Sequence, residues 1–504
     1  MTNDYYTNLY SEFSTQYNRT FGKHTVTGLA LINLQQKNLA TDKDGVQFPY
    51  LNAGIVGRVT YDYASKYLLE MNLGYTGSER FAPGNRFGLF PSVAVGWIAS
   101  EEPFFKAAFP SIDKLKFRYS DGLVGSDNAS NRWLYISNYT ASGNYITEDA
   151  AANSVAQWEM AHKRDLGIEV GLFKNQLRFS VDLYDEFRDN MLLTPNTVTF
   201  LVGNSFKDLN LGSMKKHGIE VEVEFNKKVT ANFNYFVKGN FGFNENRIVN
   251  KDDLPYSEAY QKLAGTALGG QLSGLNLNGN QFFTSVNDLH INPNPVAITA
   301  ANVGDYQYVD YNADGKINSA DLHPIEGSQY PSVTYSFSSG FSYKGFDFKF
   351  MFQGNANKYI NYNGAFEYEF LKGNLRVHTA QLDYWSPTNL TANHSTLNYQ
   401  ASNDPKYGWA GGAADATNGY GGMLAGRTWQ NADYLRLKEV YMGYNFKSKV
   451  ILKLLGIENL TVYATGNNLL TFTKLLEGDP ESTNFMDGFY PQMISGNVGF
   501  KVSF

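Results

Sequence analysis

The chain has 504 residues, of which 15% are aromatic, and it contains no cysteine. The many Tyr and Phe residues exclude a disordered chain, because disordered segments are poor in aromatic residues. The lack of cysteine excludes a disulfide-stapled fold and a thiolate metal site. The net charge of −6, without a block of like charges, gives no sign of a nucleic-acid partner. No segment is long and apolar enough for a transmembrane helix, and the first residues lack the features of a secretory signal.

An alternation of apolar and polar residues with a period of two dominates the chain. For example, the four Phe residues between 346 and 352 are separated by Asp347, Lys349 and Met351. Successive side chains of a β-strand point to opposite faces, so each such segment has one apolar and one mostly polar face. The pattern predicts about fifteen strands, near 5–18, 23–36, 52–63, 66–77, 88–100, 114–121, 163–173, 176–190, 212–226, 230–246, 331–343, 346–357, 431–446, 459–471 and 495–504.

The lengths of these strands and of their connections indicate a membrane protein. Most strands have about ten residues or more, as tilted strands that cross a bilayer need, whereas globular strands average about five or six. Short turns at 19–22, 64–65, 174–175, 227–229 and 344–345 alternate with long loops near 37–51, 78–87, 122–162, 191–211, 247–330, 358–430 and 472–494. Intermediate connections at 101–113 and 447–458 fall on the short-turn side. We therefore expect an all-β fold, an antiparallel transmembrane β-barrel with short periplasmic turns and long extracellular loops.

Two further sets of residues fit this barrel without implying chemistry. Charged residues at alternate positions, such as Glu220, Glu222 and Glu224, need only face a wet lumen. Aromatic residues near strand ends are expected to form interfacial girdles, and the alternative of a ligand platform requires them to face the lumen. These aromatic residues are Tyr61, Tyr63, Trp97, Tyr184, Tyr441 and Tyr444.

The C-terminal segment has the form of a final barrel strand. Phe500, Val502 and Phe504 share one face, and the last residue is aromatic. Such a strand resembles the sorting signal that the outer-membrane barrel-assembly machinery reads. The alternative is a last strand that ends in Phe by chance.

Several stretches resemble the SusC/RagA group of TonB-dependent transporters. They are Tyr-Asp-Tyr at 61–63, Lys-Tyr-Leu-Leu-Glu at 66–70, Gly-Ser-Glu-Arg-Phe at 77–81, Pro-Gly-Asn-Arg-Phe-Gly-Leu-Phe-Pro-Ser at 83–92, Gly-Trp at 96–97, Ser-Glu-Glu-Pro-Phe at 100–104, Asp-Tyr-Leu-Arg-Leu-Lys at 433–438, Gly-Asn-Asn-Leu at 466–469, Gly-Asp-Pro-Glu at 478–481 and Tyr-Pro at 490–491. The resemblance runs from about residue 50 to the end of the chain.

This resemblance implies energy-driven import across a Gram-negative outer membrane. In the family a 22-stranded barrel encloses an N-terminal plug, and a TonB box couples the plug to the TonB complex. A SusD-like surface lipoprotein acts as a lid, and the substrates are usually glycans or peptides. The other expected partners are outer-membrane lipid, including lipopolysaccharide, and the assembly machinery.

The chain differs from the family pattern because a plug, a TonB box and a signal peptide are missing from its sequence. It resembles a C-terminal half, over residues 1–504, of such a barrel. With fifteen strands the first and last would both point down and could not pair antiparallel, and an open edge is not tolerated in lipid. We therefore expect the remaining strands to lie in residues outside this sequence, either in the same protein or on another chain.

The loop expected at 247–330 contains a calcium-type motif at 310–321, D-x-N-x-D-G-x-I-N-x-x-D. Calcium prefers oxygen ligands, and a Gly at the sixth position permits the sharp turn of such a loop. The predicted ligands of a structural Ca²⁺ are Asp310, Asn312, Asp314, Lys316 through its backbone carbonyl, Asn318 and Asp321. The alternative is an Asp/Asn/Gly-rich turn without a metal.

The second large loop, at 358–430, contains a Gly-rich stretch that lacks the features of a phosphate-binding loop. Its Tyr407, Trp409 and Tyr420 could stack on sugar rings, although exposed loop aromatics also occur without a ligand. None of the seven His residues belongs to a hydrolase or metalloprotease motif, so no enzyme is expected.

Three functions remain in competition: an importer, a passive or structural outer-membrane barrel such as a porin or scaffold, and a secreted carbohydrate-binding β-protein. The sequence motifs favour the importer. The physical pattern alone separates the first two from the third.

Overall fold

The computed structural model describes residues 6–39, 49–128, 133–198, 200–254, 258–268, 277–293, 302–317, 319–324, 327–361, 379–397, 429–446, 456–475, 478–482 and 492–503. Fifteen long antiparallel strands follow one another in the sheet in chain order, which confirms the predicted all-β class and strand count. The chain divides into two compact units. Unit 1 contains Met1–Phe225 and Asn244–Pro255, and unit 2 contains Asn226–Phe243 and Tyr256–Phe504.

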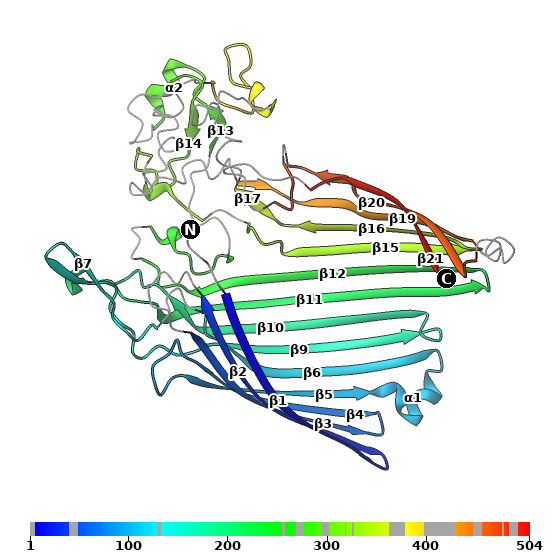
Figure 1. Ribbon diagram of the computed structural model, residues 1–504. Helices are drawn as coiled ribbons and strands as arrows, with labels where there is room; N and C mark the ends of the chain where they lie inside the picture. The colour runs from blue at the N-terminus through cyan, green and yellow to red at the C-terminus, as the bar shows by residue number, and fades with distance from the viewer. Residues whose placement is uncertain are drawn as a thin grey trace. The chain divides into compact units, whose positions relative to one another are not determined.

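Unit 1 is a run of long strands with its loops at one end and its short turns at the other. Helix α1 (Pro103–Ala108) lies at the turn end, and the hairpin of β7 (Tyr139–Ser142) and β8 (Tyr145–Glu148) projects beyond the loop end (Figure 1). The long strands are β1 (Tyr6–Phe21), β2 (His24–Leu39), β3 (Tyr50–Tyr63), β4 (Tyr67–Ser78), β5 (Phe87–Ile98), β6 (Ile112–Ser126), β9 (Glu159–Leu172), β10 (Leu177–Leu193) and most of β11 (Leu209–Thr230).

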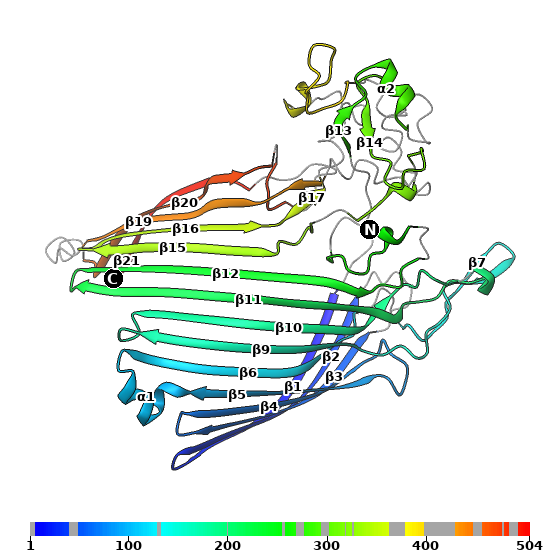
Figure 2. The same ribbon diagram turned by 180° about the vertical axis from the view of Figure 1, so that it is seen from behind.

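Unit 2 has the same plan with larger loops. Its strands β15, β16, β19 and β20 lie side by side in both views (Figures 1 and 2). The long strands are most of β12 (Phe233–Asn250), β15 (Val333–Tyr343), β16 (Phe346–Ala356), β19 (Tyr434–Phe446), β20 (Asn459–Thr473) and β21 (Ser495–Ser503). The loops contain β13 (Leu277–Phe282), α2 (Val286–Ile291), β14 (Tyr306–Tyr308), β17 (Tyr359–Asn361) and β18 (Trp429–Asn431).

The strand registers give each unit one apolar and one polar face. In unit 2, Phe341 pairs with Phe348 and Phe337 pairs with Phe352, so their rings share a face. Apolar side chains on such faces are strongly exposed, as Met71 at 52% and Leu73 at 48% show in unit 1. An exposed apolar face on long strands is what lipid-facing strands present.

Within the described residues, no helix is both long enough and apolar enough to cross a bilayer.

Several strands are longer than the sequence pattern predicts. β6 covers Ile112–Ser126 rather than 114–121, and β11 covers Leu209–Thr230 rather than 212–226. The added residues include Lys227 and Lys228, which break the alternation that identified the strand. Backbone pairing continues where the side chains no longer need to face lipid, because ladder hydrogen bonds do not depend on side-chain polarity.

Short turns close several hairpins at the turn end, as between β3 and β4. Ala64 and Ser65 both have positive φ, at 56° and 54°, as a type I′ turn requires. The carboxylate of Asp62 accepts a 2.7 Å hydrogen bond from the Ser65 N–H, which stabilises this backbone. This geometry confirms the short turn predicted at 64–65, although neither residue belongs to the Asn-Gly pair that is typical of such turns.

Candidate functional site

The polar face of unit 1 is lined with ion pairs between neighbouring strands. Arg118 contacts Asp165 at 3.4 Å and Glu169 at 3.5 Å, and it also pairs with Asp182. Gly167 leaves room for this guanidinium, because a Cβ there would lie 2.5 Å from the Arg118 Nε. The paired side chains remain partly exposed, so this face is a wet, charged wall, as predicted for Glu220, Glu222 and Glu224.

Two of the predicted girdle residues lie on the polar face instead. Tyr441 pairs with Lys349 in the ladder, with the Lys349 Nζ 5.0 Å from its ring centre, and it stacks on Tyr463 at 6.0 Å. Tyr184 has the Nζ of Lys216 5.4 Å from its ring centre. The girdle prediction is therefore wrong for Tyr184 and Tyr441.

The girdle prediction rested on the position of Tyr441 near a strand end, whereas its ladder position places it on the opposite face from Met442 and Tyr444. The register of β19 shifts between Leu437 and Glu439, so the residue parity that holds at Leu435 and Leu437 is reversed afterwards. Trp97 stacks on Phe117 at 5.8 Å and Tyr444 pairs with Phe346, so these two lie on the apolar face as predicted.

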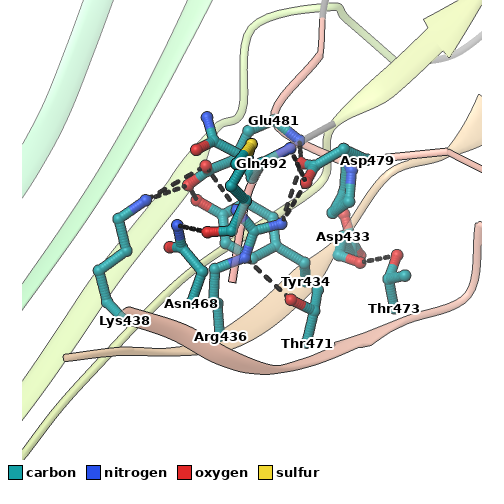
Figure 3. A network of polar contacts seen from close by, with 12 residues as sticks. Asp433, Tyr434, Arg436, Lys438, Asn468, Thr471, Thr473, Asp479, Glu481 and Gln492 are labelled. Carbon is teal, nitrogen blue, oxygen red and sulfur yellow. Dashed lines mark hydrogen bonds and ion pairs between the residues drawn. The ribbon is translucent and has the colours of Figure 1, made fainter. Parts of the chain in front are cut away.

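A buried charge cluster lies where β19 enters the loop side of unit 2 (Figure 3). Arg436 is 1% exposed and donates to both carboxylate oxygens of Asp479 at 2.9 and 2.8 Å. Its other nitrogens donate to Glu481 at 2.7 Å and to the Thr471 hydroxyl at 2.9 Å. A planar guanidinium suits this arrangement because its fork of donors matches two carboxylates at once.

Further donors complete the cluster. The Tyr434 hydroxyl donates to Glu481 at 2.7 Å, and Lys438 lies 3.3 Å from the same carboxylate (Figure 3). Lys358 is 5% exposed and its Nζ donates to the Pro480 carbonyl at 2.6 Å. Burial lowers the pKa of Lys358, against the opposing influence of the two carboxylates. Buried charges that are paired in this way tie the segment 478–482 to β19.

Three sequence stretches that are far apart in the chain therefore meet in one place. The stretch 433–438 supplies Arg436 and Lys438, and the stretch 478–481 supplies the two carboxylates. The stretch 466–469 forms the bulge of β20 opposite Lys438, with Asn468 at a positive φ of 54° and its side chain donating to the Met493 carbonyl at 3.0 Å. These motifs hold structure rather than perform chemistry.

Unit 1 has a comparable anchor made of apolar residues. Phe81, from the stretch 77–81, is fully buried with Leu134, Ala156, Trp158 and Leu192. The Trp158 indole donates to the Arg86 carbonyl at 3.1 Å, which connects the stretch 83–92 to the loop before β9. Sequence reasoning did not find Leu134 or Trp158, because they lie in a loop without periodicity.

In the predicted calcium loop, the Asp side chains accept hydrogen bonds from backbone N–H groups of the same loop. Asp310 accepts from the N–H groups of Asp314 at 3.1 Å and Gly315 at 2.7 Å, and Asp321 accepts from the Tyr311 N–H at 2.8 Å. Gly315 has a φ of 82°, as the sharp turn requires. Among the described residues, which omit Asn318, no group of three or more His, Asp or Glu is placed to hold a metal. Calcium binding stays a prediction.

The other predicted site residues lie mostly outside the described residues. Tyr407, Trp409, Tyr420 and Phe504 are among those. Phe500 and Val502 pair with Val462 and Leu460 on one face of β21, and Phe500 is 74% exposed. This exposed terminal face is compatible with the predicted assembly signal.

Long antiparallel strands with an exposed apolar face and a charged polar face define an integral β-barrel protein of the bacterial outer membrane. The solved structure of the RagAB peptide transporter has the same fold, with a TM-score of 0.73 and 18% identity over 99% of this chain and 56% of that chain.

Two curated proteins extend this result to the sequence. TonB-dependent receptor P3 of Formosa agariphila is 25% identical over 562 residues, covering 99% of this chain and 52% of that protein. TonB-dependent receptor SusC of Bacteroides thetaiotaomicron is 26% identical over 468 residues, covering 89% of this chain and 43% of that protein. No protein-family model matches the chain. The chain is similar to SusC/RagA-type TonB-dependent transporters, and it spans about half the length of the curated relatives it matches.

Proposed function

We propose that the chain forms the barrel part of a TonB-driven importer that takes up glycans or peptides beneath a SusD-like lipoprotein lid. The observation that carries this proposal is the similarity to a TonB-dependent receptor over 99% of the chain. The charged polar face supports it, because a solute that crosses the membrane through a barrel needs a wet inner wall. Coupling to the TonB complex would come from the part of the protein outside this sequence.

The β7–β8 hairpin is the proposed contact for the lid. Its Tyr139, Tyr145 and Ile146 are 65%, 77% and 76% exposed at the loop end of unit 1. Exposed aromatic and aliphatic side chains on a projecting hairpin are typical of a protein interaction surface. A Tyr145→Ser, Ile146→Ser double variant of the full-length protein is expected to lose co-purification of the lipoprotein. The matched variant Val155→Ser, in the neighbouring loop, should retain it.

For the substrate we propose that Tyr407, Trp409 and Tyr420 stack on sugar rings or on the side chains of a peptide. Trp409→Ala is expected to lower uptake. Tyr384→Ala serves as the control, because Tyr384 is an exposed aromatic residue of the same loop at 41% exposure. Equal loss in both variants would assign the effect to the loop as a whole.

The deciding experiment uses the full-length protein in its own outer membrane. Uptake of labelled glycans and of labelled peptides is measured with an intact TonB complex and after its removal. Import of one substrate class that stops without TonB supports the proposal and identifies the class. Uptake that continues without TonB supports the second candidate, a passive or structural barrel.

A further inference from the structure

Two tyrosine rings on the polar face of unit 2 lie over glycine residues. A Cβ at Gly443 would be 2.5 Å from the Tyr441 Oη, and a Cβ at Gly499 would be 2.8 Å from the Tyr463 Cζ. In the ladder Tyr463 pairs with both of these glycines, one on each side. Glycine inside a strand often marks a place where another group approaches the backbone closely, and here that group is a tyrosine ring.

The two rings together form one aromatic surface. Their centres are 6.0 Å apart and their planes differ by 18°. Both side chains are half-buried, so part of each ring is exposed on the polar face. Aromatic residues can form a ligand platform only if they face the lumen. Tyr441 and Tyr463 meet this condition, because the ladder places them opposite Lys349 and Gly443 on the polar face.

Polar side chains surround this aromatic surface in the same two rows of the ladder. They are Ser342, Asp347, Lys349, Thr465 and Asn497. The Ser342 hydroxyl donates to Asp347, and Asn497 donates to the Thr465 hydroxyl at 3.5 Å. The Nζ of Lys349 lies 5.0 Å from the ring centre of Tyr441. One carboxylate and one ammonium balance each other, so these neighbours offer hydrogen bonds without a net charge.

The aromatic surface lies on the turn side of unit 2, away from the long loops. β19 runs from the buried Arg436 cluster on the loop side to Phe446, and Tyr441 lies between the two. Tyr463 lies near the beginning of β20, which starts on the same turn side. A solute that has passed the loops would therefore meet these rings on its way to the periplasm.

We propose that Tyr441 and Tyr463 form a platform for an uncharged sugar unit in transit, an inference that rests on the proposed import function. A sugar ring has a face of C–H groups, which stacks on an aromatic ring, and an edge of hydroxyl groups, which need donors and acceptors. The two tyrosine rings provide the first, and the surrounding polar side chains provide the second. The balanced charges of Asp347 and Lys349 favour a neutral saccharide over a peptide with charged ends.

The first test places a photoreactive group on this platform in the full-length protein in its own outer membrane. Tyr463→p-benzoylphenylalanine is irradiated during uptake of maltohexaose, laminarihexaose and xylohexaose mixed with a tryptic digest of casein. We expect saccharide adducts on the peptide that contains position 463, and none when the same group replaces Tyr444 on the apolar face. Adducts of casein peptides alone, cross-links to the protein's own chain alone, or no adduct at all would overturn the proposal.

The second test measures uptake of the same three saccharides in labelled form. Tyr441→Ala, Tyr463→Ala is expected to lower uptake at low substrate concentration at least about fivefold, which corresponds to about 1 kcal/mol of lost binding. Tyr441→Phe, Tyr463→Phe should retain uptake, because the ring face and not the hydroxyl stacks on the sugar. The matched control is Tyr444→Ala, Phe472→Ala, on the apolar face of the same two strands. Equal loss in this control would overturn the proposal.

A third variant moves one ring without removing it. Gly499→Ala places a Cβ 2.8 Å from the Tyr463 ring, so the ring must shift and saccharide uptake should fall. Gly496→Ala, in the same strand, is the control, because a Cβ there would come no closer than 3.8 Å to a neighbouring atom. Unchanged uptake in Gly499→Ala, with normal heat-modifiable migration as evidence of a folded barrel, would overturn a role for the position of the ring.

Removal of the TonB complex separates the platform from the import function. Saccharide uptake that stops without TonB but is unchanged in Tyr441→Ala, Tyr463→Ala would overturn the platform and leave the proposed function intact. Uptake that continues without TonB yet falls in this variant would support the platform and contradict TonB-driven import.

Discussion

The two units use charge in different ways. On the polar face of unit 1, ion pairs such as Arg58–Glu70 are half to one-third exposed and repeat along the strands. In unit 2 the Arg436 side chain is 1% exposed and holds Asp479 and Glu481, which belong to a loop segment. The exposed ion pairs of unit 1 make its polar face hydrophilic. The buried cluster of unit 2 holds a loop segment against the end of a strand.

This difference follows from the dielectric surroundings of the charges. An exposed pair exchanges water for its partner with little gain, whereas a buried pair that loses one member leaves a charge without solvent. We therefore expect substitutions in the Arg436 cluster to be costly and those on the unit 1 wall to be mild. We expect the same difference in cost between buried ion pairs that hold loops and exposed ion pairs on the polar faces of the strands.

The largest effect is expected for Arg436→Ala. Removal of the guanidinium leaves the carboxylates of Asp479 and Glu481 buried without their main partner, at a cost of about 3–5 kcal/mol. Limited proteolysis should cut the connection 474–494 much faster than in the unchanged protein. Arg436→Lys should recover only part of the protection, because an ammonium lacks the planar fork of donors. Equal protection of all three proteins would contradict a clamping role for the cluster.

A smaller effect is expected from calcium on the loop 310–321. If it binds with a Kd of about 0.1–1 mM, as extracellular calcium modules do, 10 mM calcium would stabilise the folded loop by about 1.4–2.7 kcal/mol. Calcium should then slow proteolysis of this loop in the unchanged protein but not in Asp310→Ala, Asp314→Ala. Protection that is the same in all four samples would leave the loop as a metal-free Asx turn.

A pH effect is expected at Tyr260, which donates its hydroxyl to the Ala320 carbonyl beside this loop. Burial, together with the negative charges of Glu258 and Asp321, raises the pKa of Tyr260 to about 12. A raised phenol pKa means that this contact stabilises the loop fully below pH 10, the ordinary value, and is lost as the pH rises through 12. The difference in absorbance at 295 nm between the unchanged protein and Tyr260→Phe isolates this phenol. A midpoint near pH 10 would show that Tyr260 is not buried beside these negative charges.

The smallest effect is expected for Arg58→Ala on the wall of unit 1. Its ion pair with Glu70 is 2.7 Å long but 49% and 33% exposed, so the expected loss is about 0–1 kcal/mol. Heat-modifiable migration should hardly change. A loss of stability as large as that of Arg436→Ala would show that exposed ion pairs on the polar face and the buried Arg436 cluster do not differ in this way.

The sequence predicted the strands well and the clusters poorly. Alternation identified every long strand because a lipid-facing residue must recur at every second position. The girdle prediction for Tyr441 was wrong because it rested on nearness to a strand end and not on the face that the residue occupies in the ladder. The stretches 433–438 and 478–481 were recognisable separately, but their contact depends on how a loop returns to the sheet.

By itself the sequence determined the all-β class, the direction of the loops and the likeness to the SusC/RagA group, since period and motif are local properties of the chain. Only the tertiary structure decided that Arg436 is buried and that the stretches 433–438 and 478–481 are in contact. These facts depend on strand register and loop packing, which join residues that are tens of positions apart. Local pattern carries no information about such pairs.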